Sequence, residues 1–245
     1  VVVVDTVAVQ SDTGLRFIPV SVKKAAPIID LAQRYLGNLP STGRNENWKN
    51  LSPVMAPGIT RVTIRKGSDP QGMVGMVMAE PIDWDESTVL HFAMLKEIIS
   101  IKLIEVIREQ LSGVYSPQVM LNAEKYPTAE YNLIVMFGCS PKRAEKLSKT
   151  VLAEITKLKK KGPTEADLQK AREALLRNRE TDLQKNDFWL GKIESIYFNG
   201  DDPSSILTFN DKVNTVGIND LKNTAARYFN TDHYVRVILM PEEKK

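Results

Sequence analysis

The sequence contains few of the residues from which metal sites and covalent catalytic sites are usually built. Its 245 residues include one cysteine and two histidines. The single cysteine, Cys139, excludes a framework of internal disulfides but does not identify the compartment. Neither His91 nor His233 lies in a His-Glu-x-x-His motif or in its inversion, His-x-x-Glu-His. We therefore expect no metal site in this chain, with His91 on a helix face or in the core and His233 at a strand edge.

Charge and local motifs argue against several other functions. The formal net charge is only +3, from 33 basic and 30 acidic residues, which is too small an excess to indicate nucleic-acid binding. The lysine-rich run at 157–161 is typical of a solvated helix end, and no aromatic residues lie beside it to stack on bases. No glycine-rich phosphate loop occurs, and Cys139 lies in an apolar run without a nearby histidine. A buried structural thiol is the favoured interpretation of Cys139.

The chain also lacks long apolar runs. The opening run of valines at 1–4 is too short to span a bilayer, and it lacks the charged start and cleavage site of a signal peptide. We expect no membrane span and interpret the chain as a fragment or processed product of a longer protein. Glycine, proline, serine and asparagine are concentrated at 37–58, which indicates a linker and a domain boundary.

Hydrophobic periodicity predicts an α+β fold in which helices pack on one face of a largely antiparallel sheet. Strands are predicted at 1–9, 15–22, 59–66, 73–80, 114–123, 131–139 and 234–240. Helices are predicted at 26–36, from about 83 to 111, at 140–161, from 164, and at 187–198, 204–210 and 218–229. The helix that ends near 111 is apolar nearly all round in its middle, so we expect it to be deeply buried.

The end of this buried helix carries the candidate functional residues. Arg108 and Tyr115 lie seven residues apart in the sequence, on either side of Gly113, where the helix gives way to a strand. A guanidinium and a phenol held on rigid elements could grip a peptide carbonyl or stabilise an oxyanion. The alternative is that Arg108 pairs with Glu105 or Glu109 on the helix surface and that Tyr115 is a half-buried strand aromatic.

The stretch from Arg108 to Ser116 resembles the second-half signature of the pitrilysin/insulinase family of zinc metallopeptidases. Further segments resemble that family in the same order, from about residue 30 to residue 241. They are 35–41, 131–141, 162–170, 186–190 and 228–241. The opening departs from the pattern, because the family has a glycine near Ser21 and residues 1–15 match nothing in it.

The resemblance implies a non-catalytic half of a zinc endopeptidase, whose paired homologous α+β halves enclose a peptide in a chamber. Arg108 and Tyr115 match the family's substrate-contacting pair, and residues 84–95 carry no zinc motif. The resemblance therefore implies that this chain has no catalytic or metal-binding residue, and that zinc is supplied by the parent protein or by a partner half. Residues 1–45 would be the tail of a preceding homologous domain, and 46–245 the C-terminal domain.

The partners implied are a peptide substrate and the homologous zinc-bearing half. A periplasmic or exported location is favoured by the type of family member that the chain resembles. The alternative is that the chain is a scaffold or partner subunit of a pitrilysin-like assembly that has lost its chemistry.

Overall fold

A computed structural model describes residues 6–11, 14–19, 26–40, 42–44, 49–51, 55–109 and 117–242. The chain divides into two compact units. One comprises residues 1–50 with 179–194, and the other residues 51–178 with 195–245. Within the described part of 37–58, the chain forms neither helix nor strand, which agrees with the predicted linker.

The smaller unit contains a hairpin and a helix near the start of the chain. Strands β1 (Thr6–Ser11) and β2 (Gly14–Pro19) pair antiparallel, as predicted for the two β-rich segments. Helix α1 (Ala26–Tyr35) follows, within one residue of its predicted bounds. Its apolar side chains are exposed, with Ile28 at 68% and Tyr35 at 67%. Residues 1–5 and 20–25, which include part of both predicted strands, lie outside the described residues.

The larger unit is built on a five-stranded sheet of order β3-β7-β4-β6-β5. Its strands are β3 (Ile59–Arg65), β4 (Gly72–Pro81), β5 (Gln118–Glu124), β6 (Glu130–Cys139) and β7 (Tyr234–Met240). Three neighbouring pairs are antiparallel, and β3 pairs parallel with β7. The predicted, largely antiparallel sheet is therefore confirmed, and its first and last strands in sequence are neighbours.

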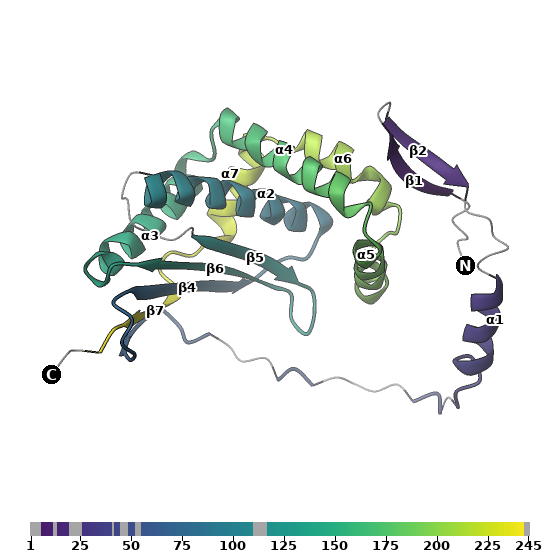
Figure 1. Ribbon diagram of the computed structural model, residues 1–245, viewed down its shortest axis with the longest axis horizontal. Coiled ribbons are helices and arrows are strands. Elements are labelled where there is room, and N and C mark those ends of the chain that lie inside the picture. Colours follow the sequence, from purple (N-terminus) through teal and green to yellow (C-terminus); the bar gives the residue numbers. More distant parts are fainter. Residues whose placement is uncertain are drawn as a thin grey trace. The chain divides into compact units, whose positions relative to one another are not determined.

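Helices of the larger unit lie on one side of this sheet (Figure 1), as predicted. The helical segments that lie wholly in this unit are α2 (Glu86–Leu103), η2 (Ile104–Glu109), η3 (Pro141–Arg143), α3 (Ala144–Lys161), α6 (Ser205–Thr215) and α7 (Ile218–Tyr228). Helix α4 (Glu165–Asp182) ends in the smaller unit, and α5 (Asn186–Asn199) begins in it. Gly162 ends α3 in a conformation with φ of 76°, which glycine adopts without a steric penalty. Helix α6 is longer than the predicted 204–210, because Val213 extends its apolar side into the core.

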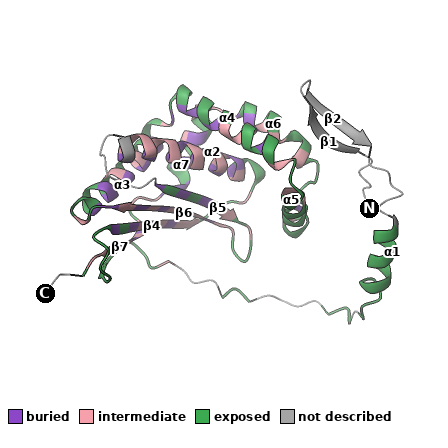
Figure 2. Cartoon of the chain, in the orientation of Figure 1, coloured by how far each residue is buried: buried purple, intermediate pink, exposed green. Residues whose placement is uncertain are grey.

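The core of the larger unit lies between the sheet and its helices, where buried residues are concentrated (Figure 2). Helix α2 contributes Phe92, whose ring contacts Tyr131, Tyr228 and Phe229 at centroid distances of 5.1, 5.6 and 6.2 Å. Tyr131 donates its hydroxyl hydrogen to the backbone oxygen of Tyr228 at 2.9 Å. Aromatic rings in this geometry stabilise a fold beyond the contribution of their apolar burial. The cluster therefore holds α2, β6 and the end of α7 together.

Replacing Phe92, which is 1% exposed, with alanine should lower the free energy of unfolding by about 3–5 kcal/mol, because it removes a buried ring and leaves a cavity. Chemical denaturation followed by circular dichroism measures the change. The control is Leu207→Ala on α6, where the side chain is 72% exposed and the expected change is within about 0.5 kcal/mol. Equal effects of the two substitutions would contradict the proposed core.

Candidate functional site

The candidate site lies at the end of α2. Asp85 caps the start of this helix by accepting a hydrogen bond from the Thr88 backbone N–H at 2.8 Å. The helix is then buried along most of its length, as predicted. Beyond Leu103 the chain continues as a π-helical segment, η2, through Ile104–Glu109. The prediction of one long helix is thus confirmed to Glu109, but its last turn has a different hydrogen-bonding pattern, which hydrophobic periodicity does not reveal.

The π-helical segment contains Arg108, one of the two predicted site residues. Single π-helical turns within α-helices often occur at functional sites, because the wider turn changes the direction of the side chains that follow. Ile107 remains buried at 0% exposure, as does Leu103 one turn earlier, so η2 is anchored in the core up to the residue before Arg108. The side chain of Arg108 and the whole of Tyr115 lie outside the described residues.

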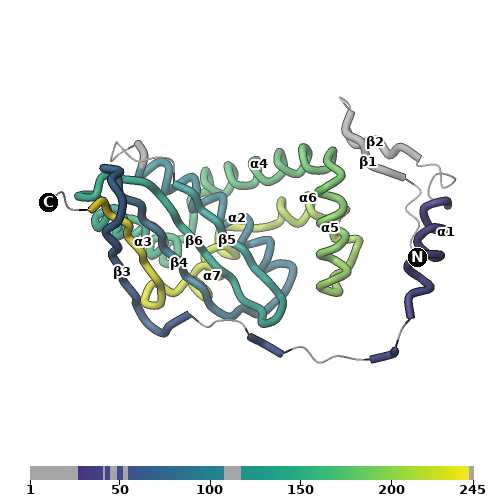
Figure 3. Tube along the Cα trace, turned by 60° about the horizontal axis from the view of Figure 1, so that its bottom comes forward, coloured from purple at the N-terminus to yellow at the C-terminus, as the bar shows by residue number. Residues whose placement is uncertain are grey.

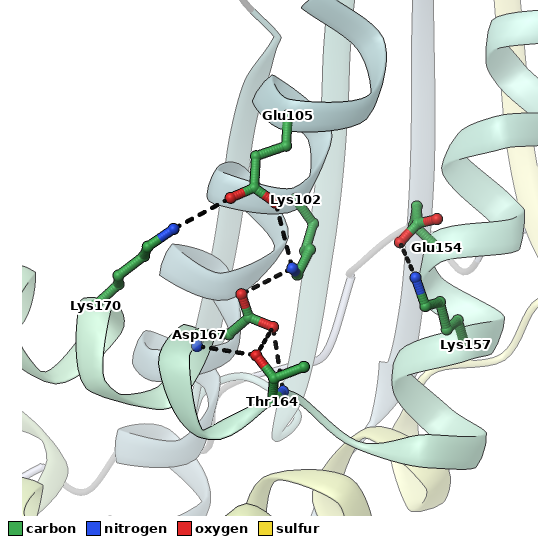
Figure 4. A network of polar contacts seen from close by, with 7 residues as sticks. All are labelled: Lys102, Glu105, Glu154, Lys157, Thr164, Asp167 and Lys170. Carbon is green, nitrogen blue, oxygen red and sulfur yellow. Dashed lines mark hydrogen bonds and ion pairs between the residues drawn. The ribbon is translucent and has the colours of Figure 1, made fainter. Parts of the chain in front are cut away.

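A network of ion pairs holds the base of η2 against the start of α4 (Figure 4). Lys102 Nζ lies 2.8 Å from Asp167 Oδ1 and 3.2 Å from Glu105 Oε2. Lys170 Nζ lies 3.2 Å from the other carboxylate oxygen of Glu105. No local sequence pattern reveals this network, because the residues that it pairs between the two helices are 65 residues apart in the sequence.

Asp167 is the central member of the network. It is 2% exposed, and it also takes part in a capping box at the start of α4. Asp167 Oδ2 accepts from the backbone N–H of Thr164 at 3.1 Å, and the Asp167 backbone N–H donates to Thr164 Oγ1 at 3.2 Å. One carboxylate therefore caps α4 and anchors α2.

Burial and pairing have opposite effects on the pKa values of these groups. Burial acts to raise the pKa of Asp167, but hydrogen bonds from Lys102 and Thr164 outweigh it, and the pKa is lowered. Likewise burial acts to lower the pKa of Lys102, while its bonds to Asp167 and Glu105 raise it overall. The charged pair is thus the stable form at neutral pH. Glu105 already has two cationic partners in this arrangement, which weakens the case for it as the partner of Arg108.

The other residues that the sequence singled out make contacts typical of residues that stabilise the fold. His91, on α2, lies with Nδ1 2.9 Å from Thr224 Oγ1, which agrees with a half-buried helix residue. His233 lies just before β7, with Nδ1 2.8 Å from Glu80 Oε1. Cys139 is buried, and burial raises the pKa of its thiol, which agrees with a structural rather than a nucleophilic role. Lys157, in the basic run, pairs with Glu154 at 3.6 Å on the last turns of α3.

A zinc site requires a cluster of nitrogen, sulfur or carboxylate donor groups. No group of three or more histidine, cysteine, aspartate or glutamate side chains is placed to hold a metal within the described ranges. A depression of about 480 Å³ is lined by Glu80, Asp83, Arg227 and other residues near the ends of β4 and α7, and its lining does not include η2. Arg227 and Asp83 form an ion pair in that lining. The described residues therefore do not fit a zinc site.

Of the helices that the structure describes, none has the length and apolar character needed to cross a bilayer.

Comparison with known proteins identifies the family. The family described as "Peptidase M16 inactive domain" matches residues 24–175, and the chain belongs to it. This result confirms the resemblance to zinc metallopeptidases that the motifs indicated.

Two curated proteins and one solved structure illustrate the relationship. The chain is 26% identical over 179 residues to a zinc protease PQQL-like protein of Arabidopsis thaliana, covering 67% of this chain and 19% of the relative. It is 27% identical over 185 residues to the probable zinc protease PqqL of Haemophilus influenzae, covering 73% and 19%. The periplasmic protease PqqL of Escherichia coli shares the fold with a TM-score of 0.74 at 18% identity, covering 95% of this chain and 26% of that chain. The chain thus spans about a fifth of the length of these curated relatives.

Replacing Asp167 with asparagine should lower the free energy of unfolding by about 1–3 kcal/mol at pH 7, because Lys102 loses the anion that compensates its partial burial. Urea denaturation measures the change. The matched control is Asp182→Asn, whose partner Lys185 lies 2.9 Å away on the surface, and which should cost at most about 1 kcal/mol.

Comparing the wild-type chain with Asp167→Asn also tests how the free energy of unfolding depends on pH. Because the folded-state pKa of Asp167 is lowered, its stabilising contribution is complete above the unfolded-state value and is lost as pH falls through the folded-state value. The difference between the wild-type chain and Asp167→Asn should therefore shrink as urea denaturation is repeated from pH 7 down to pH 3. A difference that stayed constant over this range would contradict the role of the charged carboxylate.

Proposed function

We propose that this chain is the non-catalytic, substrate-contacting half of a zinc-dependent endopeptidase that cleaves peptides between homologous halves. The observation that carries the proposal is the family match together with the place of Arg108, on a π-helical turn that follows a helix packed into the core. A rigid helix end suits a residue that must hold its position against a substrate. The names of the curated relatives, both zinc proteases, support the class of reaction.

In this proposal Arg108 and Tyr115 contact the substrate near the bond that is cleaved. Arginine offers a planar set of donors for a carbonyl or carboxylate, and tyrosine a phenolic donor. The network of Lys102, Asp167 and Glu105 supports the role indirectly, because it fixes the turn that precedes Arg108 to a second helix. A site keeps its geometry only when supporting residues hold the site residues in position.

Zinc belongs to another part of the parent protein or to a partner half in this proposal. The described residues of this chain offer no donor set for it. Residues 1–45 are proposed to be the tail of a preceding homologous domain, and residues 46–245 the C-terminal domain. A periplasmic location is proposed by analogy with the Escherichia coli relative, which is described as a periplasmic protease.

In the parent protein, Arg108→Ala should lower kcat/KM for peptide cleavage by about 10- to 1,000-fold, because a positioned donor is lost, and Tyr115→Phe should also lower it. The zinc content, measured by elemental analysis, should not change. Arg227→Ala is the control, since it removes an exposed arginine that pairs with Asp83 and should leave turnover unchanged. Unchanged turnover in Arg108→Ala and Tyr115→Phe would contradict the substrate contact. A parent protein without zinc would instead favour a scaffold.

The purified 245-residue chain should bind no stoichiometric zinc and should cleave no peptide, because its described residues contain no metal-donor cluster. Equilibrium dialysis with zinc and a fluorogenic peptide assay measure the two properties. Peptide cleavage by the highly purified chain that a chelator abolishes would refute the assignment of the metal to another half.

A further inference from the structure

His233 lies where three segments of the larger unit meet. It directly precedes β7, which pairs with β3 from Tyr234 and Ile59 onward. Figure 3 shows β3 and β7 side by side, with β3 at the edge of the sheet. The side chain of His233 contacts the end of β4 through Glu80, and it also contacts residues 55–58, which lead into β3. His233 is therefore placed to control how this segment is attached to the sheet.

Both ring nitrogens of His233 face oxygen acceptors. Nδ1 lies 2.8 Å from Glu80 Oε1, and Nε2 lies 3.0 Å from the backbone oxygen of Ala56. Neither an ionised carboxylate nor a backbone carbonyl can donate a hydrogen bond. Because neutral imidazole has a single N–H, only the doubly protonated imidazolium satisfies both contacts at once.

The surroundings of Glu80 favour the charged form of His233. Asn230 Nδ2 donates to the same carboxylate oxygen, Glu80 Oε1, at 2.9 Å and so holds it beside the ring. The side chains of His233 and Glu80 are 19% and 24% exposed, so water and salt screen the pair only in part. The hydrogen bond to Glu80, and to a smaller extent the one to Ala56, raise the pKa of His233 above its usual value.

Other charged groups near the end of β4 have different surroundings. Asp83, Lys159 and Arg227 line the same depression as Glu80, and Arg227 forms an ion pair with Asp83. Burial, with a smaller contribution from Glu80, raises the pKa of Tyr131, which therefore stays a neutral phenol. These groups do not compete with the imidazole for the Glu80 oxygen that it contacts.

The segments on either side of His233 add one further carboxylate. Asp232 precedes it in the sequence and is exposed, while residues 55–58 include no titratable side chain. Arg61 of β3 donates to the hydroxyl of Tyr234 at 2.9 Å. Within the described residues, the carboxylate at the end of β4 is thus the charged partner of the imidazole.

Loss of one proton breaks the contact with Ala56. The hydrogen bond to the ionised carboxylate is the stronger of the two, so the remaining proton stays on Nδ1. Nε2 then presents a lone pair to the Ala56 oxygen, and two acceptors repel each other. Pro57 has no N–H, and the next hydrogen bond along the chain joins the Tyr234 N–H to the Gly58 oxygen at 3.2 Å. The fixed end of the linker thus moves by two residues, which lengthens its free part by about 7 Å when extended.

We propose that His233 is a pH-sensitive clamp, which as an imidazolium holds residues 55–58 against the end of β4 and releases them when it loses a proton. The sign follows from the raised folded-state pKa of His233. The clamp is complete below the pKa of histidine in the unfolded chain, and it is lost as pH rises through the folded-state value. The reach of the residues before Met55 would therefore increase with pH. This device does not depend on the proposed function.

NMR spectroscopy of the full chain with isotope-labelled histidine measures the protonation of its two histidines from pH 5.5 to pH 9.5. His233 should titrate at a higher pH than His91, whose pKa is lowered by burial. Neutral His233 should keep its proton on Nδ1. Glu80→Gln should shift the titration of His233 to lower pH, because it removes the carboxylate. Asp232→Asn is the matched control, since it removes a neighbouring carboxylate that does not contact the ring, and it should leave the titration unchanged.

A nitroxide spin label at Ala56→Cys measures the release of the segment. The substitution keeps the backbone oxygen that His233 contacts, and Ala56 is exposed. Cys139 is 1% exposed and should stay unlabelled, which the wild-type chain checks. The mobility of the label, read from its electron paramagnetic resonance spectrum, should increase over the pH range in which His233 titrates. A label at Leu207→Cys on α6, where the side chain is 72% exposed, should show no such change.

Two second substitutions in the Ala56→Cys chain link the release to the imidazole. His233→Gln should abolish the pH dependence of the label, because an amide does not titrate. Glu80→Gln should move the change in mobility to lower pH, together with the titration of His233. Circular dichroism checks that each variant is folded.

A label at residue 56 whose mobility stays constant from pH 5.5 to pH 9.5 would overturn the proposal. So would a change in mobility that persists in His233→Gln. A titration of His233 at or below the pH at which His91 titrates would also overturn it, and this comparison is made in the wild-type chain, so it holds even where a variant does not fold.

Discussion

The larger unit depends on the burial of α2. Eight of the helix's residues are buried, and they face both the sheet and other helices. A helix that is apolar all round stays helical in water only when it is enclosed, so the sheet, α3 and α7 must assemble around it. The aromatic cluster at Phe92 and the ion pair of Lys102 with Asp167 secure two regions of α2 by different interactions.

This enclosure explains why the proposed site lies where it does. Helix α2 ends at Leu103, and the π-helical segment that follows is still anchored in the core by Ile107. The capping carboxylate of Asp167 holds the base of that turn, so a single residue links the start of α4 to the support of η2. The position of η2 is thus set by the burial of Ile107 and by ion pairs with α4.

Much of this fold could be predicted from sequence, because its elements have strong periodic patterns and clear boundaries. β7 was predicted with its exact bounds, and the helix predicted from residue 164 begins at Glu165. The π-helical turn was missed because hydrophobic periodicity does not distinguish it from a continuation of the α-helix before it. The lysine network was missed because it joins residues distant in sequence, and the parallel pairing of β3 with β7 because register is not a local property.

The position of β7 gives the larger unit a particular order of assembly. This strand follows the other strands of the sheet in the sequence, yet it lies between β3, the first of them, and β4. During synthesis β3 therefore has no neighbour until the residues from Tyr234 onward emerge. The gap in the sheet, and the apolar surface beside it, would stay open to other chains for the whole of that interval. The sheet of the larger unit is therefore complete only when β7 has paired with both β3 and β4.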